Sequence, residues 1–142
     1  MPDESLYNEQ LVGDEVETQV LIPEGDYEAI ITSIDPYVAS TGNKCAWWRF
    51  KLSGDNEYAG TPLSSNTNLP VSGLSKEDLR KCWKWRGFCE AISAPLRSTV
   101  KEVEQVAKGK KVIARVVNSF YGGVERSAVD GIVTKQSTEI PF

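Results

Sequence analysis

The chain has 142 residues, of which 40% are hydrophobic and 25% charged, a composition typical of one globular domain with a core of its own. It has no histidine, three cysteines without CxxC spacing, and no apolar run near the roughly 20 residues of a membrane span. This excludes a membrane partner, a zinc site and a disulfide framework, and we expect a cytoplasmic protein without metal or cofactor.

Charge is divided unevenly along the chain. Residues 1–43 carry ten acidic and no basic side chains, whereas the remainder carries all 16 basic groups and ten acids, so the net charges are −10 and +6. A body of +6 suits a nucleic-acid partner even though the whole chain stands at −4. We expect residues 1–22 to form an acidic arm that shields the basic body, competes with nucleic acid for it, or serves only for solubility.

Three strands are predicted in the first half of the chain. Residues 27–35 are rich in Ile and Thr and form the first strand, which Pro36 ends. After a loop around Gly42, residues 44–52 form the second strand and residues 61–69 the third.

Helices and a hairpin are predicted to follow. One helix begins at the N-cap residue Ser75 and ends at Pro95, and its buried stripe consists of Leu79, Cys82, Trp85, Cys89 and Ile92. A shorter helix begins at Thr99 and ends at Gly109. Residues 111–119 and 125–135 then form two strands joined by a Gly-rich hairpin.

This element order predicts the fold class. Three strands, a helix and two more strands match a mainly β protein, a five-stranded OB-fold Greek-key barrel with the helix between strands three and four. An α+β meander packed on a helix has the same order. We therefore predict an arm (1–22), an OB-fold domain (23–135) and a C-terminal interaction tail (136–142).

The second strand carries the clearest functional pattern. Alternate residues of a strand face opposite sides, so one side receives the apolar residues Ala46, Trp48, Phe50 and Leu52. The other side receives Trp47, Arg49 and Lys51. An exposed ring beside cations suits single-stranded nucleic acid, since the ring stacks a base and the cations contact phosphates. Alternatively, Trp47 packs under the acidic arm and the two cations pair with its carboxylates.

Residues near two loops complete the predicted site. Tyr37 and Lys44 flank the loop between strands one and two, and Tyr121 and Arg126 flank the last hairpin. These two loops border the binding groove of OB-folds. The segment from Arg80 to Arg86 also mixes cations with Trp83 and Trp85, although stems of long basic side chains commonly cover the wet side of a helix.

Enzymatic chemistry finds little support in the sequence. Without histidine there is no Ser-His or Cys-His pair, and neither GxxxxGK[ST] nor GxGxxG is present. The acidic residues gather mainly in the arm, where an acid-base or metal site lacks a rigid scaffold. We predict a binding protein with no catalytic residues, and the alternative is an enzyme, a nuclease that holds its metal ion with carboxylates.

The chain ends on Glu139, Ile140, Pro141 and Phe142. The Phe ring can fill an apolar pocket while the α-carboxylate pairs with a partner's Lys or Arg, so this end suits docking. It resembles the tail of bacterial single-stranded-DNA-binding proteins, a resemblance that implies recruitment of replication or recombination proteins.

A wider resemblance rests on four short motifs in a fixed order along the chain. These motifs are residues 22–27 (IPEGDY), 40–43 (STGN), 109–112 (GKKV) and 139–142 (EIPF). In this order the chain resembles phage-encoded single-stranded-DNA-binding proteins of the OB-fold type. The resemblance implies sequence-tolerant binding of single-stranded DNA during phage replication, recombination or repair in the cytoplasm of a bacterial host, by a protein that can form homodimers. The alternative is an adapter or an inhibitor of a host nucleic-acid enzyme.

Overall fold

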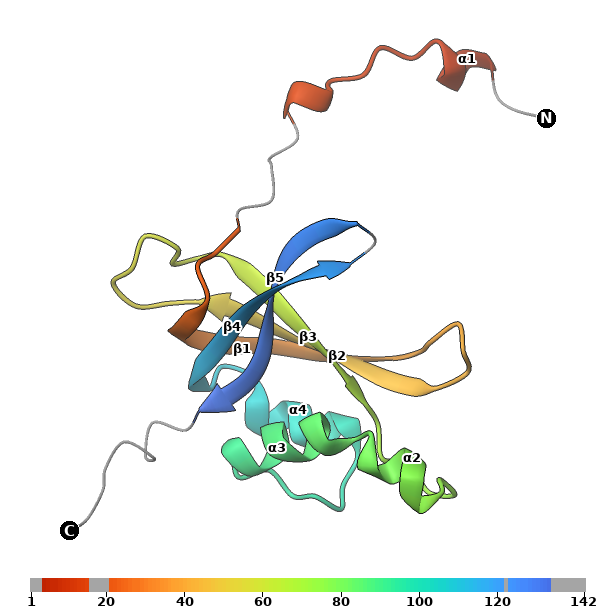
Figure 1. Cartoon of the computed structure of the whole chain (residues 1–142), viewed down its shortest axis with the longest axis vertical. Coiled ribbons are helices and arrows are strands. Elements are labelled where there is room, and N and C mark those ends of the chain that lie inside the picture. The colour runs from red at the N-terminus through yellow and green to blue at the C-terminus, as the bar shows by residue number, and fades with distance from the viewer. Residues whose placement is uncertain (1–3, 16–20, 122, 134–142) are drawn as a thin grey trace.

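The computed structural model of the chain describes residues 4–15, 21–121 and 123–133 (Figure 1). Two short turns, α1 (Glu4–Tyr7) and the 3-10 helix η1 (Gly13–Glu15), precede the sheet. The strands are β1 (Gly25–Val38), β2 (Lys44–Leu52), β3 (Pro62–Asn68), β4 (Lys111–Tyr121) and β5 (Val124–Val133). All ladders are antiparallel and the order is β3-β2-β1-β4-β5. The prediction of a mainly β protein with five strands is confirmed.

The sheet is open, and its edges are β3 and β5. Residues of these two strands lie close to one another, but no ladder joins them within the described strands. The closed barrel that we predicted is therefore not formed. A groove separates the edges where residues 61–64 approach residues 125–127, and there the two backbones do not pair.

β1 continues past Pro36, which was predicted to end it. Pro36 lies opposite Ala46, and from residue 33 onward β1 pairs only with β2 among the described strands. A residue without an N–H is tolerated where one side of a strand is unpaired. The N–H of Ile34 donates to Glu104 Oε2 at 2.8 Å, so a helix side chain replaces the missing strand there.

Three helices connect β3 to β4, namely α2 (Lys76–Arg80), α3 (Trp83–Ala91) and α4 (Val100–Ala107). The helix predicted to begin after Ser75 is thus divided near Cys82. Ser75 Oγ accepts the N–H of Asp78 at 3.1 Å, as a helix N-cap does. Most of the predicted stripe is buried, but Leu79 is 44% exposed because α2 lies at the outer end of the helical layer (Figure 1). None of the described helices is long and apolar enough to cross a membrane.

The core lies between the inner face of the sheet and α3. The four apolar residues predicted to face inward on β2 are all buried, and they are Ala46, Trp48, Phe50 and Leu52. The Trp48 ring contacts Trp85 and Phe88 at centroid distances of 5.4 and 4.9 Å. Because a slip of one residue would expose this cluster, it fixes the register of β2 and the side chains that face outward.

The residues just before β1 cross the inner side of the β4–β5 hairpin. Ile22 is fully buried, its N–H donates to Ser127 Oγ at 2.9 Å, and its carbonyl accepts from Asn118 Nδ2 at 2.9 Å. Ile22 lies in the range that we predicted as the arm, yet it packs in the core. The side chains of residues 5–14 are exposed.

Candidate nucleic-acid interface

The outer face of β2 carries the predicted ring and cations. Trp47 is half-buried, and Arg49 and Lys51 are exposed. They share this face because Trp48 and Phe50, the residues between them, are held in the core. The alternation predicted for this strand is confirmed.

Trp47 forms a stacked pair with Tyr37 of β1. The two rings have centroids 5.9 Å apart and planes inclined by 14°. Tyr37 Oη donates to Asn66 Oδ1 on β3 at 2.9 Å, and Asn66 lies directly opposite Trp47 in the β2–β3 ladder. The two rings thus form one aromatic platform across β1 and β2, and the Asn66 side chain ties it to β3.

Arg49 lies one ladder position from the platform. Its Nε contacts Oδ2 of Asp35, which is itself opposite Trp47 and accepts a hydrogen bond from Ser33 Oγ at 3.3 Å. Both members of the pair are half exposed, so water screens the pair and it contributes about 0–1 kcal/mol. Lys51 has no ion-pair partner among the described residues.

A groove of about 820 Å³ begins beside Arg49 and runs between the edges of the sheet. On one side it is lined by residues 59–64, and on the other by residues 125–127 of β5. Leu21 also lines it, so the acidic arm joins the body at the groove. Arg126, exposed and without an ion-pair partner among the described residues, faces this groove together with Arg49.

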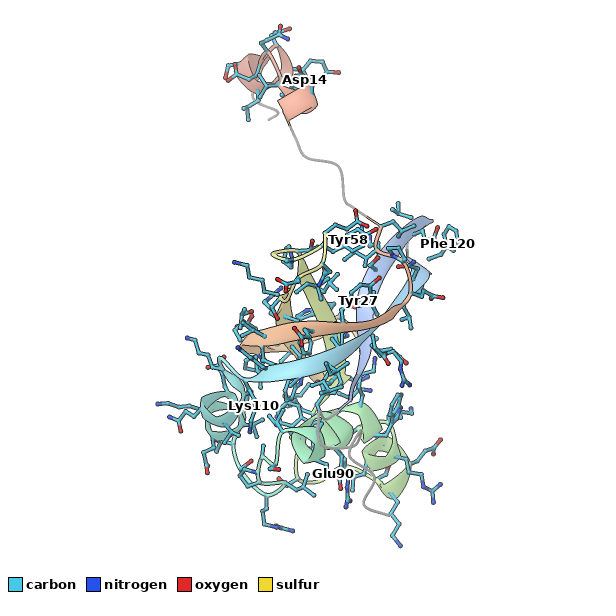
Figure 2. All side chains as sticks on the ribbon, turned by 90° about the vertical axis from the view of Figure 1, so that its left-hand side faces the viewer. Asp14, Tyr27, Tyr58, Glu90, Lys110 and Phe120 are labelled. Carbon is cyan, nitrogen blue, oxygen red and sulfur yellow. The ribbon has the colours of Figure 1, made fainter. Side chains whose placement is uncertain are left out.

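The hairpin between β4 and β5 extends beyond the sheet. Figure 2 shows Phe120 near its tip, directed away from the body, and this side chain is 74% exposed. Tyr121 is the last residue of β4 and pairs with Val124, but its side chain lies outside the described part of the structure. Its predicted contact with nucleic acid therefore stays a prediction.

One protein family matches most of the chain. The family described as "Protein of unknown function (DUF669)" matches residues 10–120, more than three quarters of the chain. The chain belongs to the DUF669 family. No curated protein matches it.

The DUF669 match covers the aromatic platform, Arg49, Lys51 and the helices α2, α3 and α4. Arg126 lies beyond it. The tail formed by Glu139, Ile140, Pro141 and Phe142 also lies beyond the match, and outside the described residues. Neither the family nor the structure assigns the tail a role.

Lys44 is separated from the other predicted site residues. It begins β2 on the same side of the strand as Ala46, opposite to Trp47. It lines a smaller cavity of about 160 Å³ with Asn68 of β3, Lys81 and Cys82. Lys44 therefore does not reach the groove that Arg49 and Arg126 share.

The third strand was predicted to border the groove, but none of its residues was predicted as part of the site. Ser64 and Asn66 face outward beside Arg49 and Trp47, whereas Leu63, Ser65 and Thr67 are buried. The polar side chains of this strand obscured its alternation. The exposed row of hydroxyl and amide groups was nevertheless readable from its period of two.

Two observations concern the metal-binding and thiol chemistry of the described residues. No group of three or more His, Cys, Asp or Glu among them is placed to hold a metal ion. Burial raises the pKa of the Cys89 thiol to about 11, and burial together with the Asp78 carboxylate raises the pKa of Cys82. Both thiols are therefore neutral at pH 7 and poor nucleophiles.

Proposed function

We propose that this protein binds single-stranded DNA without strong sequence preference, through the outer face of β2 and β3 and the adjoining groove. The Tyr37–Trp47 platform stacks a base, while Arg49, Lys51 and Arg126 contact phosphates. The motifs quoted above support a role in phage replication, recombination or repair.

The single observation that carries this proposal is the platform with a cation beside it. The Tyr37 and Trp47 rings stack on an outward face, next to Arg49, where neither contributes to the core. Stacking contributes about 1–3 kcal/mol per base and tolerates any base. The neighbouring cations then position the strand without reading its sequence.

The connectivity of the sheet supports an open variant of the OB-fold. β1 pairs with both β2 and β4, two antiparallel ladders extend from these, and the helices lie between β3 and β4. In an OB-fold the second and third strands provide the binding face and two loops border it. Here the platform and Arg49 occupy that face, and the β4–β5 hairpin stands at its border.

The test is titration of a labelled 15-nucleotide oligo-dT by fluorescence anisotropy, with the full chain and its Trp47→Ala variant. We expect Trp47→Ala to weaken binding by about 1–3 kcal/mol, roughly 5-fold to 150-fold, with its melting temperature little changed. Leu96→Ala is the control, because Leu96 is exposed in the helical layer. Full affinity in a folded Trp47→Ala protein would contradict the proposal.

Salt dependence gives a second measure. Three phosphates neutralised by Arg49, Lys51 and Arg126 contribute about −2 to the log-log slope. A parallel titration with oligo-rU compares RNA with DNA. Repeating the oligo-dT titration with a protein that lacks residues 1–20 isolates the effect of the acidic arm while Ile22 stays in the core. If no oligonucleotide binds, the adapter or inhibitor alternative is favoured instead.

A further inference from the structure

We infer that the binding path extends beyond the sheet, from the aromatic platform across Asn68 to a second contact segment at the junction of α2 and α3. This segment consists of Lys44, Lys81 and Trp83, and its ligand is the next stretch of the same single strand. The inference rests on the proposed function.

Asn68 physically connects the two regions. It lies on β3 opposite Cys45, on the outward side of the sheet, two residues beyond Asn66. Its Nδ2 donates to the carbonyl of Lys81 at 3.3 Å, and its Oδ1 accepts from Cys45 Sγ at 3.4 Å. The end of α2 is therefore tied to the same outward row of side chains that carries the platform.

Two cations meet at this connection. Lys44 and Lys81 both line the 160 Å³ cavity beside Asn68, together with Gly42 and Asn43 of the β1–β2 loop. Asp78 also lines the cavity and holds Lys81, with its Oδ1 3.6 Å from Lys81 Nζ. Both side chains of that pair are more than half exposed, so the pair is weak and leaves Lys81 available to a phosphate.

Trp83 provides the second aromatic surface. It is the first residue of α3 and is 64% exposed, unlike Trp85, which packs in the core. Lys84 Nζ lies 5.8 Å from the centre of the Trp83 ring. A large exposed ring with a cation beside it repeats the chemistry of Trp47 and Arg49, and it lies two residues from the cavity-lining Lys81.

The nature of the ligand follows from charge and continuity. The segment offers two cations and a ring, with Lys84 beside the ring, an arrangement suited to phosphate and base rather than to an apolar helix. Because Asn68 joins it to the platform, one strand that is long enough can contact both. We expect a 5-mer to bind mainly at the platform, because the Tyr37–Trp47 pair and Arg49 offer it two rings and a cation together.

The experiment compares oligo-dT of 5 and 15 nucleotides on three proteins, the full chain and its Trp83→Ala and Lys44→Ala/Lys81→Ala variants. We expect Trp83→Ala to weaken 15-mer binding at least about fivefold and to leave 5-mer binding within twofold. The double lysine variant lowers the salt slope for the 15-mer by about 1.4, the value for two phosphates. Leu96→Ala and Lys101→Ala/Lys108→Ala are the matched controls, since these side chains are exposed in the helical layer.

Two outcomes separate this inference from the proposed function. If Trp47→Ala weakens 15-mer binding while Trp83→Ala leaves it unchanged, the second segment is wrong and the platform stands. If Trp47→Ala has no effect on 15-mer binding, the proposed function itself fails. Equal losses for both oligonucleotides in Trp83→Ala would also overturn the extended path, because a second contact segment should add more affinity to the longer strand.

Discussion

Trp47 and Trp48 are neighbours in sequence and lie on opposite sides of one strand. Trp48 is fully buried and contacts Trp85 and Phe88, whereas Trp47 faces outward and stacks on Tyr37. Trp48 belongs to the packed core that stabilises the fold. The Trp47 ring is outside the core, and beside Tyr37 its outer-face neighbours are the polar side chains of Asp35, Arg49 and Asn66. The difference separates a side of β2 that maintains the fold from a side available to a ligand.

The largest expected difference between the two sides is in stability. Trp48→Ala removes a ring at the centre of the aromatic cluster and should lower the free energy of unfolding by about 3–5 kcal/mol. Trp47→Ala should change it by less than about 1 kcal/mol, since the ring is only half-buried. Urea unfolding followed by circular dichroism measures both variants. Similar losses in the two would mean that Trp47 is a structural residue.

The buried thiol beneath the sheet gives a pH signature of the inner side. Burial raises the pKa of Cys89 from 9.0 to about 11, so the folded state holds this proton more tightly than the unfolded chain. Its contribution to stability is complete below about pH 9 and is lost as the pH rises toward 11. We expect the stability difference between the full chain and Cys89→Ala to shrink over that range. Urea unfolding at several pH values measures it, and a constant difference would refute this assignment.

The sequence predicted those features that depend on local pattern. The two faces of β2 follow from strict alternation, and the cap at Ser75 and the start of the next helix near Thr99 follow from short-range side-chain chemistry. Features set by distant partners were missed. Pro36 stays in β1 because the ladder between β1 and β4 ends at Ile30, before Pro36 is reached. Ile22 is buried because Asn118 and Ser127 bind its backbone.

The candidate site divides in the same way. Trp47, Arg49 and Lys51 were found together because they share one strand. The partnership of Trp47 with Tyr37 depends on the register between β1 and β2, which no local pattern encodes. Lys44 was assigned to the groove by its closeness in sequence, but its position on β2 places it beside α2.

A smaller effect is expected from the carboxylate on the outer side. Asp35 holds Arg49 and places a negative charge beside the platform. Asp35→Asn should free the guanidinium for phosphate and strengthen oligo-dT binding about twofold to fivefold at low salt, with less gain at high salt. The exposed Asp130 of β5 has no ion-pair partner among the described residues, so Asp130→Asn is the control. Weaker binding by Asp35→Asn would mean that the pair positions Arg49 productively.

The smallest expected effect returns to the inner side, where two hydroxyl groups on β3 have different surroundings. Thr67 Oγ1 donates to the carbonyl of Ala46 at 3.1 Å, whereas the buried Ser65 Oγ has no hydrogen-bond partner among the described residues. Ser65→Ala should therefore leave the free energy of unfolding unchanged or raise it by up to about 1 kcal/mol, because no bond is lost. Thr67→Val, a matched change on the same face, should lower it by about 1 kcal/mol. Urea unfolding compares the two variants. A clear loss of stability in Ser65→Ala would show that this hydroxyl group forms a hydrogen bond in solution. The inner side of β3 would then depend on two buried polar groups, Ser65 and Thr67, whereas the inner side of β2 is apolar.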